Sequence, residues 1–209
     1  MDYFLELNRI RSMVAGKSRV MAFDLETEVR DGFLRNERII AISVATLQGK
    51  VDILTGSYEK NDQLELLGNF SRIVEDYKPE IILGYNHTSY DVSLINTNTV
   101  DMPFYEKLWG LKYYLGTSYL LDMMYVCALH GATINGEYRI RSLQKVVNAP
   151  EYKNLDLLRS KEEAEITGMN KGEAIMWLWK NSRESFERYC RGDVVDLLEL
   201  YRYILLEFR

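Results

Sequence analysis

The sequence is poor in the residues that build disulfide scaffolds, zinc centres and flexible tracts. Its 209 residues include only two cysteines, two histidines and three prolines. Cys127 and Cys190 stand in hydrophobic stretches without the spacing of a zinc site, so we expect no His/Cys metal centre. With 13 glycines and no low-complexity tract, we do not expect extensive disorder either.

The chain also lacks a long apolar run and an excess of positive charge. No stretch approaches the length needed to cross a membrane, and the N-terminal residues do not resemble a secretory signal, so we expect a cytoplasmic protein. The formal net charge is −5, whereas proteins that grip long duplex DNA electrostatically are usually basic. This balance argues against a large non-specific binding surface for nucleic acid, unless metal ions supply positive charge at the phosphate.

The hydrophobic pattern predicts an α/β fold without an internal repeat or a linker. Apolar runs and alternation predict strands at 19–27, 39–45, 51–54, 81–84 and 118–122. Helical spacing predicts helices at 2–15, 62–77, from about 90, and at 139–148, 160–167, 172–180 and 183 to the end. The first three strands should form an antiparallel meander, and the fourth should lie parallel to the first after a helical crossover.

We divide the chain into an N-terminal helical extension, residues 1–18, and one domain, residues 19–209. In the extension, Phe4, Leu7, Ile10 and Met13 fall near one helical face. That face either packs on the domain or binds a partner, and we favour packing.

Four acidic residues in three short segments are the most informative feature. Asp24 and Glu26 flank Leu25 at the end of a buried strand, so their side chains share one face. Asp91 falls in the first turn of the helix that follows Gly84-Tyr85-Asn86, and Asp193 lies four residues after Tyr189 on one helical face. Clustered carboxylates repel one another unless divalent metals lie between them, and such metals cleave phosphodiesters.

Each segment alone has an ordinary explanation. Asp24 and Glu26 can be strand-end residues that face solvent, and Asn86 or Asp91 can cap a helix. Tyr189 can be a core residue with an unrelated acid one turn later. The joint pattern is what favours a metal-dependent nuclease.

The three segments together resemble the DEDD exonucleases. In that family Asp-x-Glu stands on a first strand, Asn-x-x-x-Tyr-Asp follows a later strand, and Tyr-x-x-x-Asp lies on a C-terminal helix. The tyrosine is typical of the DEDDy branch, and Gly84-Tyr85-Asn86 with Tyr189-Cys190-x-x-Asp193 most resembles the proofreading exonuclease domain of family B DNA polymerases. The likeness covers about residues 18–205, without room for polymerase domains, and Tyr90 stands where phenylalanine is commoner.

The resemblance implies a ribonuclease-H-like fold, with a mixed five-stranded sheet of three antiparallel strands followed by two parallel strands, flanked by helices. It implies two Mg²⁺ or Mn²⁺ ions: Asp24, Glu26 and Asp193 would hold one, and Asp24 and Asp91 the other. Tyr189 would orient the attacking water, and the substrate-binding residues would be Leu25, Thr27, Asn86 and Tyr90. The implied activity is 3′→5′ hydrolysis of single-stranded or frayed DNA ends to 5′-mononucleotides.

Two other functions stay open. Some DEDDy enzymes trim RNA, and contacts to the 2′-hydroxyl, which the sequence does not reveal, separate the two sugars. The second alternative is a catalytically inactive module that binds nucleic acid or a protein partner. Such a module would have no physical reason to keep mutually repelling acids. The sequence leaves the oligomeric state unknown.

Weaker signals lie around these motifs. Asn135-Gly136 predicts a hairpin turn, which either parts two nucleic-acid strands or is an ordinary loop. His87 is expected to be exposed in its loop, where it either approaches substrate or has no role. Cationic side chains that could reach phosphates, or simply face solvent, are Arg139, Arg141, Lys145, Arg188 and Arg191. Aromatic residues that could stack on bases, or simply fill a core, are Phe104, Tyr105, Trp109, Tyr113, Tyr114, Tyr119 and Tyr125.

Overall fold

A mixed five-stranded sheet forms the centre of the molecule. The computed structural model describes residues 2–29, 37–56, 60–100, 106–158 and 169–207. The strands are β1 (Val20–Val29), β2 (Glu37–Thr46), β3 (Val51–Thr55), β4 (Ile81–Gly84) and β5 (Tyr119–Asp122), in the order β3-β2-β1-β4-β5. β1, β2 and β3 are antiparallel neighbours, whereas β4 lies parallel to both β1 and β5. The predicted sheet is confirmed in strand number and direction.

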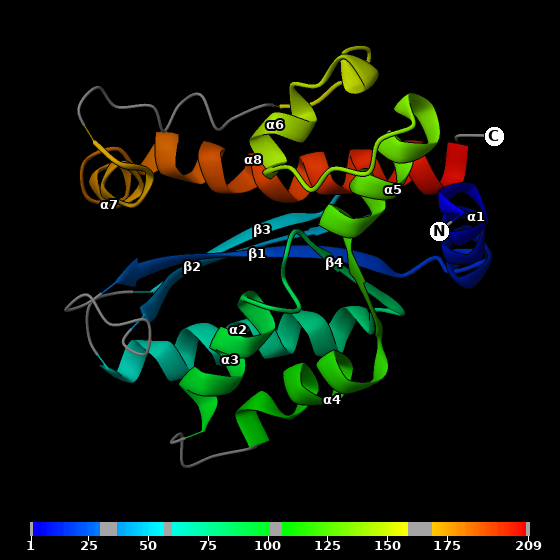
Figure 1. Ribbon diagram of the computed structural model, residues 1–209. Coiled ribbons are helices and arrows are strands. Elements are labelled where there is room, and N and C mark those ends of the chain that lie inside the picture. Colours follow the sequence, from blue (N-terminus) through cyan, green and yellow to red (C-terminus); the bar gives the residue numbers. More distant parts are fainter. Residues whose placement is uncertain (1, 30–36, 57–59, 101–105, 159–168, 208–209) are drawn as a thin grey trace.

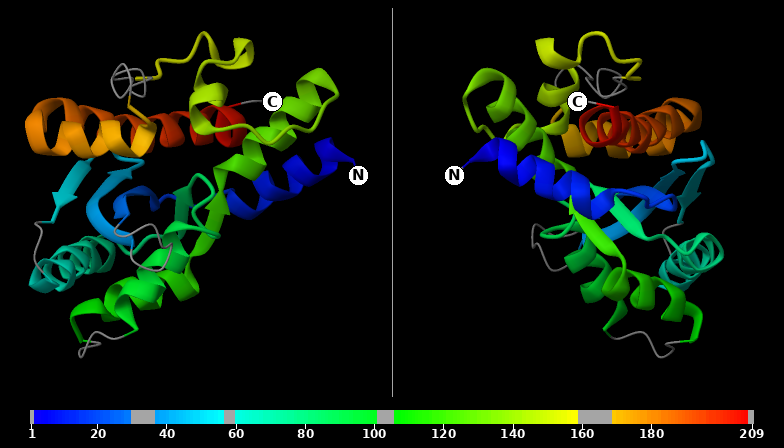
Figure 2. Two further views of the ribbon diagram at one scale, coloured as in Figure 1. Left: turned by 60° about the vertical axis from the view of Figure 1, so that its left-hand side comes forward. Right: turned by 90° about the vertical axis from the view of Figure 1, so that its right-hand side faces the viewer.

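Helices cover both faces of this sheet (Figures 1 and 2). One face carries α2 (Lys60–Tyr77), α3 (Asp91–Thr99) and α4 (Trp109–Thr117). The other carries α5 (Met123–Asn135), α6 (Leu143–Val147), α7 (Lys171–Asn181) and the long α8 (Arg183–Tyr201), which continues as a π-helical turn over Arg202–Glu207. The predicted helix at 160–167 lies outside the described residues. Nowhere in the described ranges is a helix both long enough and apolar enough to span a membrane.

The alternation of β1 decides which side chains face which layer. Val20 and Ala22 pack in the core under α8, and Met21 and Phe23 pack in the core over α2. Side chains alternate along a strand, so Asp24 continues the α8 side of the sheet. The carboxylates of β1 therefore lie beneath α8, the helix that carries Asp193.

α1 (Tyr3–Val14) packs on the domain through Leu7, Ile10 and Val14, which are all buried. Phe4 and Met13, which we expected on the packed face, are 54% and 45% exposed. The buried face of α1 therefore includes Val14 and leaves out Phe4 and Met13. The boundary at residue 18 stays a prediction.

Two local expectations between the second and third motifs are wrong. Asn135 ends α5, and Gly136 caps that helix with a positive φ of 73°, so the pair forms no hairpin turn. The expected helix over 139–148 is shorter, because only Leu143–Val147 is helical and residues 137–142 run without regular structure. This irregular segment borders the site described next.

Candidate active site

Three carboxylates meet where β1 ends beneath α8. Asp24 and Glu26 come from β1 and Asp193 from α8, and one oxygen from each lies within 4.8 Å of the others. Glu26 and Asp193 are buried, and Asp24 is half-buried. The strand register shifts directly after Glu26, a bulge that ends the regular alternation at this point. Like charges this close and this shielded from water favour a bound cation.

Asp91 approaches the same place from another element. It is the first residue of α3 and only 3% exposed. Burial, and then the charge of Asp24, raise the pKa of Asp91 to about 8, although the backbone N–H groups of Asp91 and Leu25 oppose part of that shift. Asp91 is therefore electrostatically coupled to Asp24, yet it lies outside the tight group of three acids.

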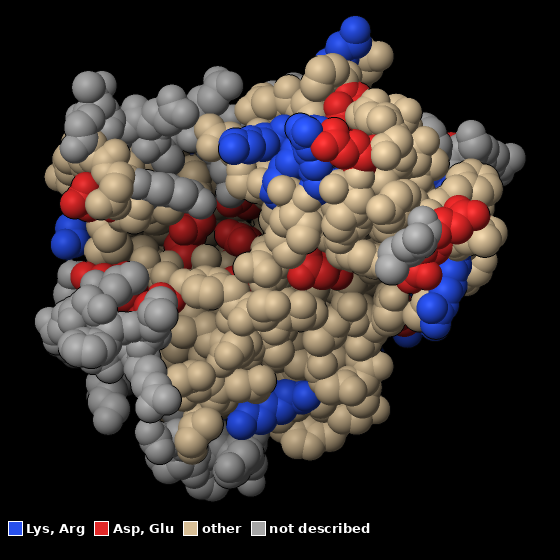
Figure 3. All heavy atoms as spheres, viewed as in Figure 1, with Lys and Arg blue, Asp and Glu red and all other residues tan. Residues whose placement is uncertain are grey.

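All four acids line one open pocket with a volume of about 440 Å³. Figure 3 shows Asp and Glu atoms in the floor of a hollow on the front face. The residues that line the pocket are Asp24, Leu25, Glu26, Tyr85, Asn86, Tyr90, Asp91, Met124, Ile140, Arg141, Ser142, Leu143 and Asp193. A pocket of this size can hold a nucleotide-sized group.

Tyr189, which the sequence predicts to orient the attacking water, lies behind the pocket wall. It is fully buried in the cluster that packs α8 and α7 on β2, and it is not among the pocket-lining residues. Burial, followed by the charges of Glu26, Asp193 and Asp24, holds the pKa of Tyr189 well above its ordinary value. The phenol therefore stays protonated beside the acids, behind the pocket wall.

The loop between β4 and α3 is held from both sides. Asn86 has a positive φ of 62°, and its backbone N–H donates to Asp122 Oδ1 at 2.9 Å. The Thr88 hydroxyl donates to Asp122 Oδ2 at 3.4 Å, while Tyr85 donates its hydroxyl proton to the Arg141 carbonyl. Sequence reasoning missed this role of Asp122, although an aspartate at a strand end before a helix is a recognisable cap.

His87 is buried in this loop, contrary to our expectation of an exposed side chain. Its ring lies edge-on to Phe23 and directly above Gly84. Burial lowers the pKa of His87 to about 4, so the ring is neutral at neutral pH. A side chain packed this closely fixes the start of the loop that carries Asp91.

We expect Gly84→Ala to destabilise the protein by about 1–3 kcal/mol. A β-carbon at Gly84 would lie 2.4 Å from His87 Cβ, so the ring and its loop would have to shift. Gly116→Ala is the matched control, because a β-carbon there meets no atom within 4 Å and alanine is the better helix former. Urea unfolding of both variants checks the prediction, which fails if Gly84→Ala is as stable as the wild type.

The four predicted substrate-binding residues gather around one side of the pocket. Leu25, Asn86 and Tyr90 line it, and the Thr27 hydroxyl lies 3.3 Å from the Tyr90 hydroxyl. Tyr90 also donates to Glu37 at the start of β2, a partner we did not predict. The tyrosine that replaces the commoner phenylalanine is thus tied down by its hydroxyl group.

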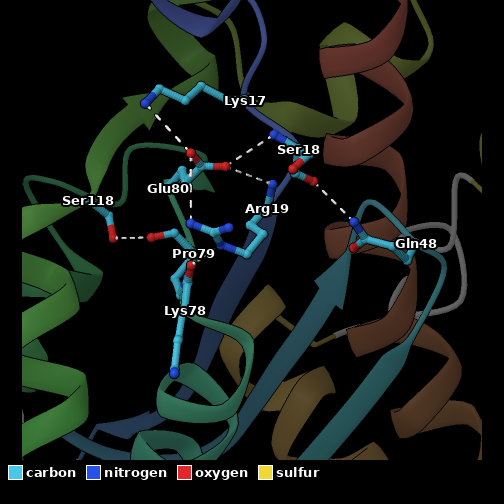
Figure 4. Close-up of polar contacts among 8 residues, drawn as sticks. All are labelled: Lys17, Ser18, Arg19, Gln48, Lys78, Pro79, Glu80 and Ser118. Carbon is cyan, nitrogen blue, oxygen red and sulfur yellow. Dashed lines mark hydrogen bonds and ion pairs between the residues drawn. The ribbon is translucent and has the colours of Figure 1, made fainter.

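At the opposite ends of the same strands, Glu80 fastens β4 to β1 (Figure 4). Its Oε2 accepts the backbone N–H groups of Ser18 and Arg19 at 3.2 Å each, and these bonds, led by that of Arg19, lower the pKa of Glu80. Arg19 returns a 2.7 Å bond from Nε to the Lys78 carbonyl. The clamp aligns two parallel strands whose far ends lead to Asp24 and Asp91.

Most of the cationic and aromatic side chains singled out in the sequence do not line the pocket. Of the five cationic candidates only Arg141 is among the described residues that line the pocket. Trp109 and Tyr113 stack with ring centroids 4.9 Å apart and are half exposed, but neither lines the pocket. Phe104 and Tyr105 lie outside the described residues.

The donor set fits hard divalent cations. All four candidate ligands are carboxylates, and oxygen ligands of this kind suit Mg²⁺ or Mn²⁺ better than metals that prefer sulfur or imidazole. Both described cysteines are buried, and burial raises their thiol pKa values, that of Cys127 to about 12. The site therefore matches the expected metal chemistry in ligand type.

Comparison with known proteins agrees with this geometry. Residues 6–102 match the family described as DNA polymerase family B, exonuclease domain. A DNA polymerase of Archaeoglobus fulgidus is 32% identical over 88 residues, which are 41% of this chain and 11% of that protein. A family B DNA polymerase structure from the archaeon Pyrobaculum calidifontis matches 90% of this chain and 24% of its own, with a TM-score of 0.64 at 19% identity. The chain thus spans a small part of the polymerases it resembles. Residues 6–102 are similar in sequence to the exonuclease domain of family B DNA polymerases, and the mixed five-stranded sheet with its flanking helices is a ribonuclease-H-like fold.

Proposed function

We propose that this protein is a two-metal 3′→5′ exonuclease that removes 5′-mononucleotides from single-stranded or frayed DNA ends. The observation that carries the proposal is the meeting of Asp24, Glu26 and Asp193 within 4.8 Å. The pocket is open, and Asp91 joins the same wall. The preference for DNA over RNA is inferred from the resemblance to DNA polymerases.

In this proposal Asp24, Glu26 and Asp193 would hold one divalent cation, and Asp24 and Asp91 would hold the second. Bound there, the cations would activate a water molecule and stabilise charge on the phosphoryl group. Water adds to phosphorus while the bond to the 3′-oxygen of the preceding nucleotide breaks. The terminal residue then leaves with its 5′-phosphate, and the shortened strand keeps a 3′-hydroxyl.

The other residues position the reacting groups. Leu25, Asn86 and Tyr90 line the pocket and would surround the terminal nucleotide, and Thr27 together with Glu37 restrains the Tyr90 ring. Tyr189 would donate a hydrogen bond to the attacking water and would not remove its proton, because burial and the acids around it raise its pKa. We expect it to act from behind the acids, because it is buried and does not line the pocket.

Digestion of end-labelled strands tests this function. A 5′-labelled single-stranded DNA with Mn²⁺ should shorten progressively from its 3′ end, and a circular strand of the same sequence should resist. Digestion of a matched RNA strand in parallel measures the preference for deoxyribose over ribose. Cleavage of the circle would indicate an endonuclease, and no cleavage with either metal would favour an inactive module.

We expect Mn²⁺ to raise the melting temperature, because the ion binds the folded site and not the unfolded chain. At a concentration 100 times its Kd, a ligand stabilises by roughly 2.7 kcal/mol. Asp24→Asn should melt higher than the wild type in EDTA, since it relieves repulsion, and should respond less to Mn²⁺. Glu184→Gln, an exposed position on α8, is the control. Identical melting curves for the wild type with and without metal would contradict a convergent site.

The pH dependence of the free energy of unfolding tests the electrostatic coupling between Asp91 and Asp24. Asp91 has a folded pKa of about 8 against an ordinary value of 3.8, so its ionisation destabilises the metal-free fold as pH rises toward 8. His87 and His130 have folded pKa values of about 4 against 6.5, so they affect stability only below pH 6.5. Between pH 6.5 and 8, metal-free protein should lose roughly 1–2 kcal/mol, and Asp91→Asn should lose less.

A further inference from the structure

The pocket has one wall that the family motifs do not account for. Ile140, Arg141, Ser142 and Leu143 line it, and they belong to the irregular segment and the start of α6. Figure 3 shows Lys and Arg atoms gathered above the hollow that holds the acids. Among the described pocket-lining residues, Arg141 has the only cationic side chain.

Arg141 is held in place from two directions. Its carbonyl accepts the hydroxyl proton of Tyr85, which ties the wall to the loop before Asp91. Its Nη1 donates to Glu151 Oε1 at 3.2 Å, and the Arg141 side chain is 33% exposed. A guanidinium carries five N–H donors, so it can bind Glu151 and a second anion at once. The Glu151 side chain is only 9% exposed, which makes it the inner, fixed partner.

The charges of the pocket favour such a group. A strand that brings its 3′ end to four carboxylates brings further phosphates with it, and the chain has a net charge of −5. Bound cations neutralise the acids themselves, but the neighbouring phosphates need donors from the protein. Ile140 beside Arg141 is 60% exposed and offers an apolar surface to a sugar or base.

We propose that Arg141 binds a backbone phosphate of the single strand whose 3′ end occupies the acid pocket, so that residues 140–143 form the strand-binding wall. This rests on the proposed exonuclease function and assigns the direction from which its substrate enters. Arg139 does not share the role, because it is paired with Glu137 at the surface and lies outside the pocket lining.

Fluorescence anisotropy of a 5′-fluorescein decathymidylate tests the proposal, with Ca²⁺ in place of Mg²⁺ to slow cleavage. Arg141→Ala should weaken binding by roughly tenfold, the effect expected for a charge-assisted hydrogen bond. The slope of log Kd against log salt should fall by about 0.7, the loss of one phosphate contact with a single strand. In steady-state cleavage KM should rise while kcat changes little, because the contact lies away from the reacting bond.

Two further variants separate binding from structure. Arg139→Ala should bind within about twofold of the wild type, since an exposed ion pair contributes little. Glu151→Gln removes the tether but keeps the cation, so it should weaken binding clearly less than Arg141→Ala does.

Equal losses in Arg141→Ala and Glu151→Gln would show that the ion pair is merely structural and would overturn the proposal. So would a wild-type affinity and salt slope in Arg141→Ala. If the wild type itself neither binds nor cleaves the strand, the exonuclease function fails, and the phosphate site fails with it.

Discussion

Asp193→Ala should abolish cleavage from the 3′ end, with a rate loss of roughly 10³-fold or more, as expected when a preorganised charged group is removed from a reaction centre. Asp193 is the only member of the three-acid group that comes from α8, so its loss leaves Asp24 and Glu26 on β1 with an open side. Asp24→Ala should be as severe, because Asp24 is shared by both proposed metal positions. Gel assays on 5′-labelled DNA with Mn²⁺ measure the loss.

The fold of the Asp193 variant must be checked independently. Removing one of several repelling carboxylates should leave the metal-free melting temperature equal or higher, so inactivity cannot be assigned to unfolding. Glu184→Ala lies on the same helix with an 88% exposed side chain and should keep full activity. Robust cleavage by purified Asp193→Ala would refute the proposed centre.

Tyr189→Phe should lower kcat by roughly 10²-fold while metal binding persists, the effect typical of a lost positioning or proton-handling group. The ring fills the same buried space in both proteins, so only the hydroxyl group is lost. That hydroxyl lies in the field of Glu26, Asp193 and Asp24, as the raised pKa shows. Calorimetric titration with Mn²⁺ should give the same affinity for the variant and the wild type.

Tyr201→Phe provides a matched control on the same helix. Tyr201 is also fully buried, but burial alone raises its pKa, to about 12, without a contribution from the acids. If hydroxyl loss matters only beside the carboxylates, Tyr201→Phe should cleave DNA normally. An unchanged rate in Tyr189→Phe would remove this tyrosine from the mechanism.

The parts of the structure that follow from local periodicity were predictable. Alternation along β1 placed Asp24 and Glu26 on one face, and helical spacing placed Tyr189 and Asp193 on another. Asn135-Gly136 was misread because a hairpin turn and a helix C-cap both use a residue with positive φ. The burial of His87 depends on its contact with Gly84, and the irregular segment before Arg141 is held by the hydrogen bond from Tyr85. Neither contact could be predicted from a periodic pattern in the sequence.

The centre draws on three elements that are far apart in the sequence: β1, the start of α3 and α8. No fragment that ends before α8 can hold the three-carboxylate group, however well its sheet has folded. The proposed hydrolysis would therefore require the complete domain, because the third carboxylate reaches the other two only when that last helix docks.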